Sequence, residues 1–350
     1  MSSTVPCPNC HTLNRPTAQF CVQCRTRMPG STGRLPPNTF LQNRFIIVKT
    51  IGGGGMGAVY LATDAQLTGQ RWAIKEMSLS QLDALEIPKA IEGFQQEAEL
   101  LKKLHHPNLP KAQPAFEQNG RWYFVMEFIE GQNLLDLLVT RGTPFDESQI
   151  LDWARQLCDV LEYLHTQNPP IIFRDLKPAN IMVEPSGRLK LIDFGIARFF
   201  KAGQTRDTIS MGSHDYAALE QFGSGQTDAR SDIHAFGATL YHLLTGEPPP
   251  KANERALDPN LLKPVRHENP NVSVRTSDVI AKALAVHPSQ RYQSVREMRA
   301  ALFSSPPLLS AVRRTRNPLP RPFQARSHTP HRPLRFPKSK PVRLKPISTH

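Results

Sequence analysis

The 350-residue sequence has few cysteines and no long apolar segment. No stretch approaches the roughly 20 apolar residues of a membrane-spanning helix, and no hydrophobic signal segment stands at the N-terminus. Only five cysteines are present, and no internal repeat is visible. These absences exclude a membrane protein, a secreted disulfide scaffold and a collagen-like chain, and we expect a cytoplasmic protein.

Acidic residues are missing from residues 304–350, which hold 8 Arg, 3 Lys and 10 Pro. The rest of the chain is close to neutral, so the net charge of +13 belongs mostly to this tail and does not mark the whole protein as a nucleic-acid binder. The tail has too little apolar surface to offset the entropy cost of ordering, and we predict that it is disordered. It could contact an acidic protein, anionic lipid or nucleic acid, or it could be a solvated extension without a dedicated partner.

Composition divides the other 303 residues into three segments. Residues 1–30 hold four of the five cysteines, and residues 31–43 are rich in Pro, Gly, Ser and Asn, which is typical of a linker. Residues 44–303 begin with strand-like patterns and one helix over 89–104, and helical spacing dominates from about Asp146. The sequence therefore predicts an α+β fold in which a small β-rich part precedes a larger helical part.

A glycine-rich segment between two predicted strands fits the pattern G-x-G-x-x-G-x-V. Its residues are Gly52-Gly53-Gly54-Gly55-Met56-Gly57-Ala58-Val59. The missing side chains let backbone N–H groups approach phosphates closely, and Val59 can cover an aromatic base. A strand rather than a helix follows, and no Gly-Lys-Ser/Thr ending is present, so neither a Walker loop nor a Rossmann turn fits. Taken alone, the segment is equally compatible with an ordinary hairpin turn.

Further motifs follow in order along the chain. Lys75 lies inside an apolar strand, where its ammonium needs an acidic partner, and Glu97 or Glu99 on the next helix could supply one. Two later segments read Phe173-Arg174-Asp175-Leu176-Lys177-Pro178-Ala179-Asn180 and Leu191-Ile192-Asp193-Phe194-Gly195. With the glycine segment, these residues resemble the protein kinase family at four places, in the right order and spacing. The resemblance covers residues 44–303 and implies the two-lobed protein kinase fold, with a small lobe over about 44–130 and a large lobe over about 131–303.

The resemblance implies a catalytic role for four residues. Lys75 would hold the α and β phosphates of ATP and pair with Glu97. Asp175 would accept or orient the proton of the substrate hydroxyl. Lys177, two residues later, resembles the serine/threonine branch of the family.

The resemblance also implies how ATP and its metal ions would bind. Asn180 and Asp193 would hold Mg²⁺ or Mn²⁺. The segment around Met126 looks like the hinge that binds adenine through its backbone, and Val59 and Met182 would enclose the base. The nucleotide-binding residues implied in this way are Gly52, Gly53, Gly54, Gly55, Met56, Gly57, Val59, Ala73, Lys75, Glu127, Ile129 and Met182.

Three positions depart from the family's pattern. Phe173 replaces the usual histidine of the catalytic loop, Asp215 replaces a glycine beside the substrate peptide, and Leu219 replaces a proline. Glu220, next to Leu219, can still pair with Arg291 in a later helix. None of these changes removes a phosphate or metal ligand, so we expect an active enzyme.

The segment between Asp193 and Glu220 would be the activation loop. Because Arg174 precedes the catalytic aspartate, the resemblance implies regulation by phosphorylation of this loop. The candidate acceptors are Thr205, Thr208 and Ser210, although such residues are common in any exposed loop.

The first 30 residues contain the spacing C-x₂-C-x₁₀-C-x₂-C, formed by Cys7, Cys10, Cys21 and Cys24. Two close thiolate pairs at this interval match a tetrahedral zinc site and resemble a zinc ribbon. So short a segment could not fold without the metal. Two disulfides are the alternative, and His11 is an outside candidate for a ligand.

Together these patterns predict a cytoplasmic serine/threonine protein kinase with an N-terminal zinc ribbon. It would transfer the γ-phosphoryl group of Mg-ATP to Ser/Thr hydroxyls of protein substrates in signalling, and phosphorylate its own activation loop. One alternative is a pseudokinase scaffold that acts through the ribbon and the basic tail. A zinc-dependent nucleic-acid binder is a third interpretation, which rests only on the two ends of the chain.

Overall fold

The computed structural model describes most of residues 1–30 and of residues 44–303. The described residues are 5–15, 18, 20–26, 28, 34–54, 57–77, 85–193, 214–222 and 227–304. The predictions for Gly55 and Met56, for the three phosphorylation candidates Thr205, Thr208 and Ser210, and for the tail after Ser304 lie outside them.

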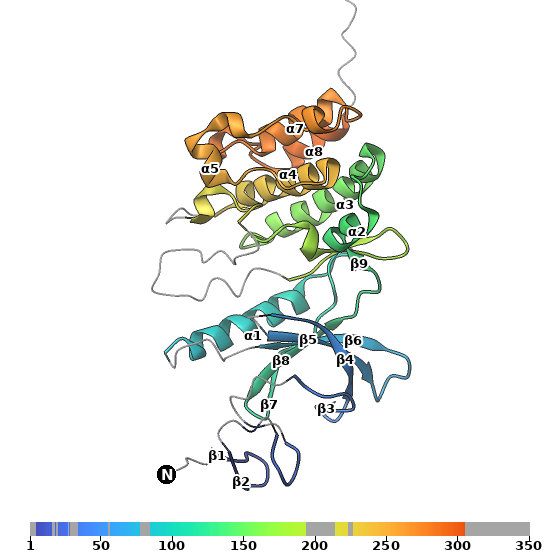
Figure 1. Ribbon diagram of the computed structural model, residues 1–350, viewed down its shortest axis with the longest axis vertical. Coiled ribbons are helices and arrows are strands. Elements are labelled where there is room, and N and C mark those ends of the chain that lie inside the picture. Colours follow the sequence, from blue (N-terminus) through green and yellow to red (C-terminus); the bar gives the residue numbers. More distant parts are fainter. Residues whose placement is uncertain are drawn as a thin grey trace, which may run out of the picture. The chain divides into compact units, whose positions relative to one another are not determined.

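The small lobe is a six-stranded antiparallel sheet in the order β3-β4-β5-β6-β8-β7 (Figure 1). Its strands are β3 (Phe40–Leu41), β4 (Phe45–Gly54), β5 (Gly57–Asp64), β6 (Arg71–Met77), β7 (Phe116–Gln118) and β8 (Arg121–Glu127). The glycine-rich segment forms the end of the β4–β5 hairpin. Helix α1 (Ile87–Lys103) covers the sheet, and its Phe94 ring meets Phe124 of β8 with the centroids 5.2 Å apart.

Part of the predicted linker packs on this sheet. Leu35 and Leu41 are buried together with Phe45, and the Leu35 N–H donates to the Tyr60 hydroxyl at 3.0 Å. Both leucine side chains are apolar, and burial removes them from water. The described part of residues 31–43 therefore belongs structurally to the small lobe.

The large lobe is mostly helical, as the sequence predicts. Its helices are α2 (Leu134–Arg141), α3 (Glu147–His165), α4 (Ala229–Thr245), α5 (Ala252–Leu257), α6 (Val265–Glu268), α7 (Val274–Ala283) and α8 (Val295–Phe303). Short 3₁₀ turns are η1 (Pro178–Asn180), η3 (Leu219–Phe222), η4 (Pro259–Leu261) and η5 (Pro288–Gln290). A small sheet adds β9 (Gln132–Asn133), β10 (Ile181–Val183) and β11 (Leu189–Leu191).

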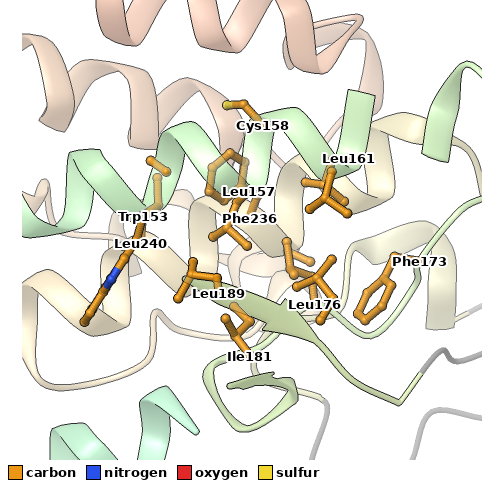
Figure 2. Packing of buried hydrophobic residues seen from close by; sticks show 14 of the residues in the cluster. Trp153, Leu157, Cys158, Leu161, Phe173, Leu176, Ile181, Leu189, Phe236 and Leu240 are labelled. Carbon is orange, nitrogen blue, oxygen red and sulfur yellow. The ribbon is translucent and has the colours of Figure 1, made fainter. Parts of the chain in front are cut away.

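The core of the large lobe forms between α3, α4 and the loop that follows α3 (Figure 2). The apolar stripe of α3 is buried along its length, and α4 is buried on all sides. Figure 2 shows Trp153, Leu157, Cys158, Leu161, Phe173, Leu176, Ile181, Leu189, Phe236 and Leu240 in this cluster. This core therefore supports the loop that carries Asp175. Within the described ranges, no helix combines the length and apolarity needed to cross a membrane.

Candidate active site

Lys75 forms two ion pairs, one within the small lobe and one to the large lobe. It lies on β6, and its Nζ atom is 3.3 Å from Glu97 Oε1 of α1 and 2.9 Å from Asp193 Oδ1, which follows β11. Glu97 is buried, whereas Glu99 is partly exposed and lies near Lys102, so the structure selects Glu97 as the partner. Burial lowers the pKa of Lys75, but the charges of Asp193 and Glu97 outweigh this effect and raise it above its usual value. The ammonium is therefore charged at neutral pH.

Asp175 is contacted by two other residues of the predicted catalytic loop. The Asn180 amide Nδ2 donates to both the carbonyl oxygen and Oδ2 of Asp175, each at 2.9 Å. Lys177 Nζ is 3.1 Å from the same Oδ2 atom. Turn η1 brings Asn180 back to the aspartate, so three residues that the sequence singled out are in contact.

The backbone of this loop is fixed by Asp232 of α4, which is fully buried. Its carboxylate accepts hydrogen bonds from the Phe173 N–H at 2.8 Å and the Arg174 N–H at 2.7 Å. His165 Nε2, at the end of α3, donates to it at 2.7 Å. Sequence reasoning did not find His165, because it belongs to none of the recognised motifs.

One backbone hydrogen bond brings the segment of Asp193 to Asn180, the other predicted metal ligand. The Ile192 N–H donates to the Asn180 carbonyl at 2.9 Å, which places the residue before Asp193 against Asn180. The Asn180 Nδ2 atom is used toward Asp175, so Oδ1 is the atom it can offer a cation. Carboxylate and amide oxygens are the hard ligands that Mg²⁺ prefers, so this pair fits the expected ion.

The predicted base-binding residues lie on strands of both lobes. Ala73 of β6 is paired in register with Met126 of β8, Val59 is on β5, and Met182 is on β10 of the large lobe. Gly52, Gly53 and Gly54 pair with β5 up to Gly57.

The hinge has an anchor that the sequence did not reveal. Lys190 of β11 is buried, and its Nζ atom donates to Glu127 Oε2 at 3.0 Å and to the Leu109 carbonyl at 3.2 Å. Glu127 and Ile129 are the positions predicted to meet adenine, so this contact ties their segment to the large lobe. A lysine in a short apolar strand is its only sequence signal.

The segment from His214 to Phe222 leads back to the catalytic loop. Gln221 Nε2 donates to the Arg174 carbonyl at 3.0 Å, one residue before Asp175. Asp215 is partly exposed, and its Oδ1 lies 3.8 Å from Lys251 Nζ. Leu219 begins turn η3, and the predicted pair of Glu220 with Arg291 is present at 2.7 Å. Arg291 follows η5 instead of lying in a helix, because its backbone is extended there.

Four cysteines of the N-terminal segment converge on one point. The Sγ atoms of Cys7, Cys10, Cys21 and Cys24 all lie within 4.8 Å of one another. The pairs Cys7–Cys24 and Cys10–Cys21 are each 3.5 Å apart, close to the ~3.8 Å between sulfurs that bind one zinc at about 2.3 Å. None of the five cysteines forms a disulfide bond, which contradicts the disulfide alternative.

The two cysteine turns have the same backbone geometry. The Cys7 N–H donates to Thr12 and the His11 N–H donates to Cys7, while the Cys21 N–H donates to Thr26 and the Arg25 N–H donates to Cys21. His11 and Arg25 both adopt positive φ, 58° and 62°. The His11 side chain is exposed and outside the four-sulfur group, so the structure does not support it as a ligand.

The two lobes and the residues brought together between them are those of the protein kinase fold. The protein kinase domain model matches residues 45–303, and the chain belongs to the protein kinase family. Among solved structures, the apo form of PpkA-294 has a TM-score of 0.69 at 28% identity and covers 78% of this chain and 100% of that one. The Mycobacterium tuberculosis PknI kinase domain, at 24% identity and a TM-score of 0.62, shares the fold over 77% of this chain and 98% of its own.

Curated relatives are bacterial serine/threonine-protein kinases. PknB of Mycobacterium leprae (strain TN) is 34% identical over 280 residues, which is 76% of this chain and 43% of that protein. PrkC of Bacillus subtilis (strain 168) is 34% identical over 268 residues, 74% of this chain and 40% of that protein. The matched region thus spans less than half the length of these relatives.

Proposed function

We propose that this chain is a serine/threonine protein kinase that transfers the γ-phosphoryl group of ATP to hydroxyls of protein substrates. The observation that carries the proposal is the set of contacts where the two lobes meet. Lys75 forms ion pairs with Glu97 and with Asp193, and Asp175 accepts a hydrogen bond from Asn180 of its own loop. The serine/threonine class follows from Lys177 and from the relatives' names.

The contacts at Asp175 and Lys75 indicate the chemical step. Lys75 is charged and is held in place by two carboxylates, so it can bind the α and β phosphates of ATP. The oxygen of the substrate hydroxyl forms a bond to the γ phosphorus as the bond from that phosphorus to the β–γ bridging oxygen breaks, and ADP leaves. The hydroxyl proton passes to the Asp175 carboxylate, and the Lys177 ammonium at 3.1 Å stabilises the developing charge. Mg²⁺ held by Asn180 and Asp193 would neutralise charge on the transferred group.

We extend the proposal to the zinc ribbon and the compartment. Four unpaired thiols with sulfur spacings close to those of a tetrahedral site support one structural zinc ion held by Cys7, Cys10, Cys21 and Cys24. A reduced cysteine cluster joined to an ATP-dependent domain is consistent with work in the cytoplasm, where thiols stay reduced and ATP is present.

The test combines a catalytic variant with a matched control. Wild type, Asp175→Asn and Asp278→Asn, which changes an exposed aspartate of α7, are incubated with Mg-ATP and a generic basic protein substrate. We expect wild type and Asp278→Asn to phosphorylate the substrate, and Asp175→Asn to be slower by at least about 100-fold. Mass spectrometry would also show whether Thr205, Thr208 or Ser210 gains phosphate. Equal rates for Asp175→Asn and wild type would contradict the mechanism, and bound ATP without any transfer would favour a pseudokinase scaffold.

A further inference from the structure

Tyr216 is held at two atoms by one helix. His234 Nδ1 lies 3.2 Å from the Tyr216 carbonyl oxygen, and His242 Nδ1 lies 2.6 Å from the Tyr216 hydroxyl. Both histidines are buried on α4, about two turns apart. Helix α4 therefore fixes the backbone and the side chain of the same residue.

Arg255 of α5 determines which ring nitrogen of His234 carries the hydrogen. Its Nη2 atom lies 2.7 Å from His234 Nε2, inside the lobe. A guanidinium has donors only, so Nε2 must accept, and the neutral ring then carries its hydrogen on Nδ1. That N–H donates to the Tyr216 carbonyl. Burial, together with the charges of Arg291 and Arg255, lowers the pKa of His234 well below its usual value, which keeps the ring neutral.

Arg255 is anchored on its other side by the backbone. Its Nε donates to the Pro250 carbonyl at 2.9 Å and its Nη1 donates to the Leu284 carbonyl at 2.5 Å, while the residue is only 2% exposed. The planar guanidinium directs donors toward all three acceptors at once, which the compact ammonium of lysine cannot do. A rigid chain of contacts thus runs from Leu284 through Arg255 and His234 to Tyr216.

The held segment precedes a residue that is bonded beside Asp175, so we expect a protein substrate to bind along it. Gln221, five residues after Tyr216, bonds to the Arg174 carbonyl next to Asp175. A polypeptide whose hydroxyl reaches Asp175 therefore passes close to residues 214–217. Asp215, beside Tyr216, has a side chain that is 40% exposed and can meet such a polypeptide.

We propose that Arg255 and His234 are positioning residues for the protein substrate. They fix the Tyr216 carbonyl and with it the backbone of residues 214–217, and both are buried inside the large lobe. The inference rests on the proposed kinase function, because it assigns a role in binding that enzyme's protein substrate.

Two amide variants separate the two bonds of the His234 ring. His234→Asn places an amide nitrogen near the position of Nδ1 and keeps a donor for the Tyr216 carbonyl. His234→Gln places an amide oxygen near the position of Nε2, so it keeps the acceptor for Arg255 and loses the bond to Tyr216. The control is His267→Gln, which changes a histidine of α6 whose side chain is 61% exposed.

The readouts are kcat, the KM for the protein substrate, the KM for ATP, and the melting temperature of the full chain. We expect His234→Gln to raise the substrate KM about fivefold, as the loss of one buried hydrogen bond implies, with the ATP KM unchanged. His267→Gln should stay within about twofold of wild type. His234→Asn should lie between wild type and His234→Gln, because it keeps the bond to Tyr216 and loses the one to Arg255, and Arg255→Lys should resemble His234→Gln. An unchanged substrate KM in His234→Gln, or an equal rise in the ATP KM, would overturn the proposal.

Nuclear magnetic resonance of the ¹⁵N-histidine-labelled chain gives a readout that is independent of activity. The wild-type signals that disappear in His234→Gln belong to His234. They should show a neutral ring with its hydrogen on Nδ1. An active kinase in which His234 carries the hydrogen on Nε2 would overturn this proposal alone. A chain that phosphorylates nothing would remove the proposed function and this inference with it.

Discussion

Arg291 and Glu220 form a two-bond ion pair inside the large lobe. Arg291 Nη1 donates to Glu220 Oε1 at 2.7 Å and Nη2 donates to Oε2 at 3.1 Å. The Arg291 side chain is fully buried, and the Ser231 hydroxyl donates to the same carboxylate at 2.7 Å. The pair ties turn η3, and with it the segment at Tyr216, to the chain before α8.

Removing the charge of Glu220 should destabilise the lobe strongly. In Glu220→Gln the guanidinium of Arg291 stays buried without a counter-charge, and we expect the free energy of unfolding to fall by about 3 kcal/mol. The control Arg296→Ala breaks a pair between an exposed arginine and Glu162 at 3.7 Å and should change it by less than about 0.5 kcal/mol. Urea denaturation measures the free energy of unfolding of both variants. Equal losses in the two variants would contradict the role of the buried pair.

Asp64 should make the small lobe sensitive to acid. A hydrogen bond from Arg44, helped by Trp72 and two backbone N–H groups, lowers the pKa of Asp64 from 3.8 to about 2. Because the folded state favours the charged carboxylate, its contribution to stability is complete above about pH 4 and is lost as the pH falls toward 2. The difference in unfolding free energy between wild type and Asp64→Asn should therefore shrink between pH 4 and pH 2. A difference that does not change with pH would show that the Arg44 contact does not favour the ionised carboxylate of Asp64 in the folded protein.

The zinc ligands can be tested with two cysteine variants. Cys21→Ser removes one of the four converging sulfurs, whereas Cys158→Ser changes a cysteine of α3 that is buried in the large lobe. Metal analysis of the purified chain should find about one zinc in wild type and Cys158→Ser and a clear loss in Cys21→Ser. If all three chains hold the same amount of zinc, the four-cysteine site is wrong.

Gly131 should tolerate no side chain where the hinge enters the large lobe. Its φ is +150°, and an added Cβ would collide with the backbone carbonyl of Val183. Gly142, at the end of α2, also has a positive φ of +68° but nothing within 4 Å. We expect Gly142→Ala to cost about 1 kcal/mol of unfolding free energy and Gly131→Ala clearly more, with a higher KM for ATP. Similar losses in both variants would mean that the hinge backbone shifts without cost.

Residues in recognised motifs were predictable because their spacing along the chain is itself informative. Lys75, Asp175 and Asn180 lie in such motifs, and the structure brings each into contact with other residues that the sequence singled out. The residues alone left Glu97 and Glu99 open as the partner of Lys75, whereas the resemblance implied Glu97, and the structure brings that residue, buried on α1, to Lys75.

The part that His165 and Lys190 take in the supporting contacts could not be predicted in the same way. His165–Asp232 and Lys190–Glu127 join residues more than 60 positions apart, and the partners meet only after the lobe has folded. Leu35 shows the same limit, because a leucine among prolines and polar residues gives no periodic signal, yet it is buried against the sheet.

The hydrogen bonds of Asp232 explain how the catalytic loop accepts an unusual residue. Helix α4 holds the loop by the peptide N–H groups of Phe173 and Arg174, which every amino acid except proline supplies. The identity of the side chain at position 173 is therefore constrained by the volume of the core around it, not by the bonds that place Asp175. Evolution could exchange histidine for phenylalanine at this position and keep the geometry of Asp175, while a proline there would remove the N–H on which that geometry depends.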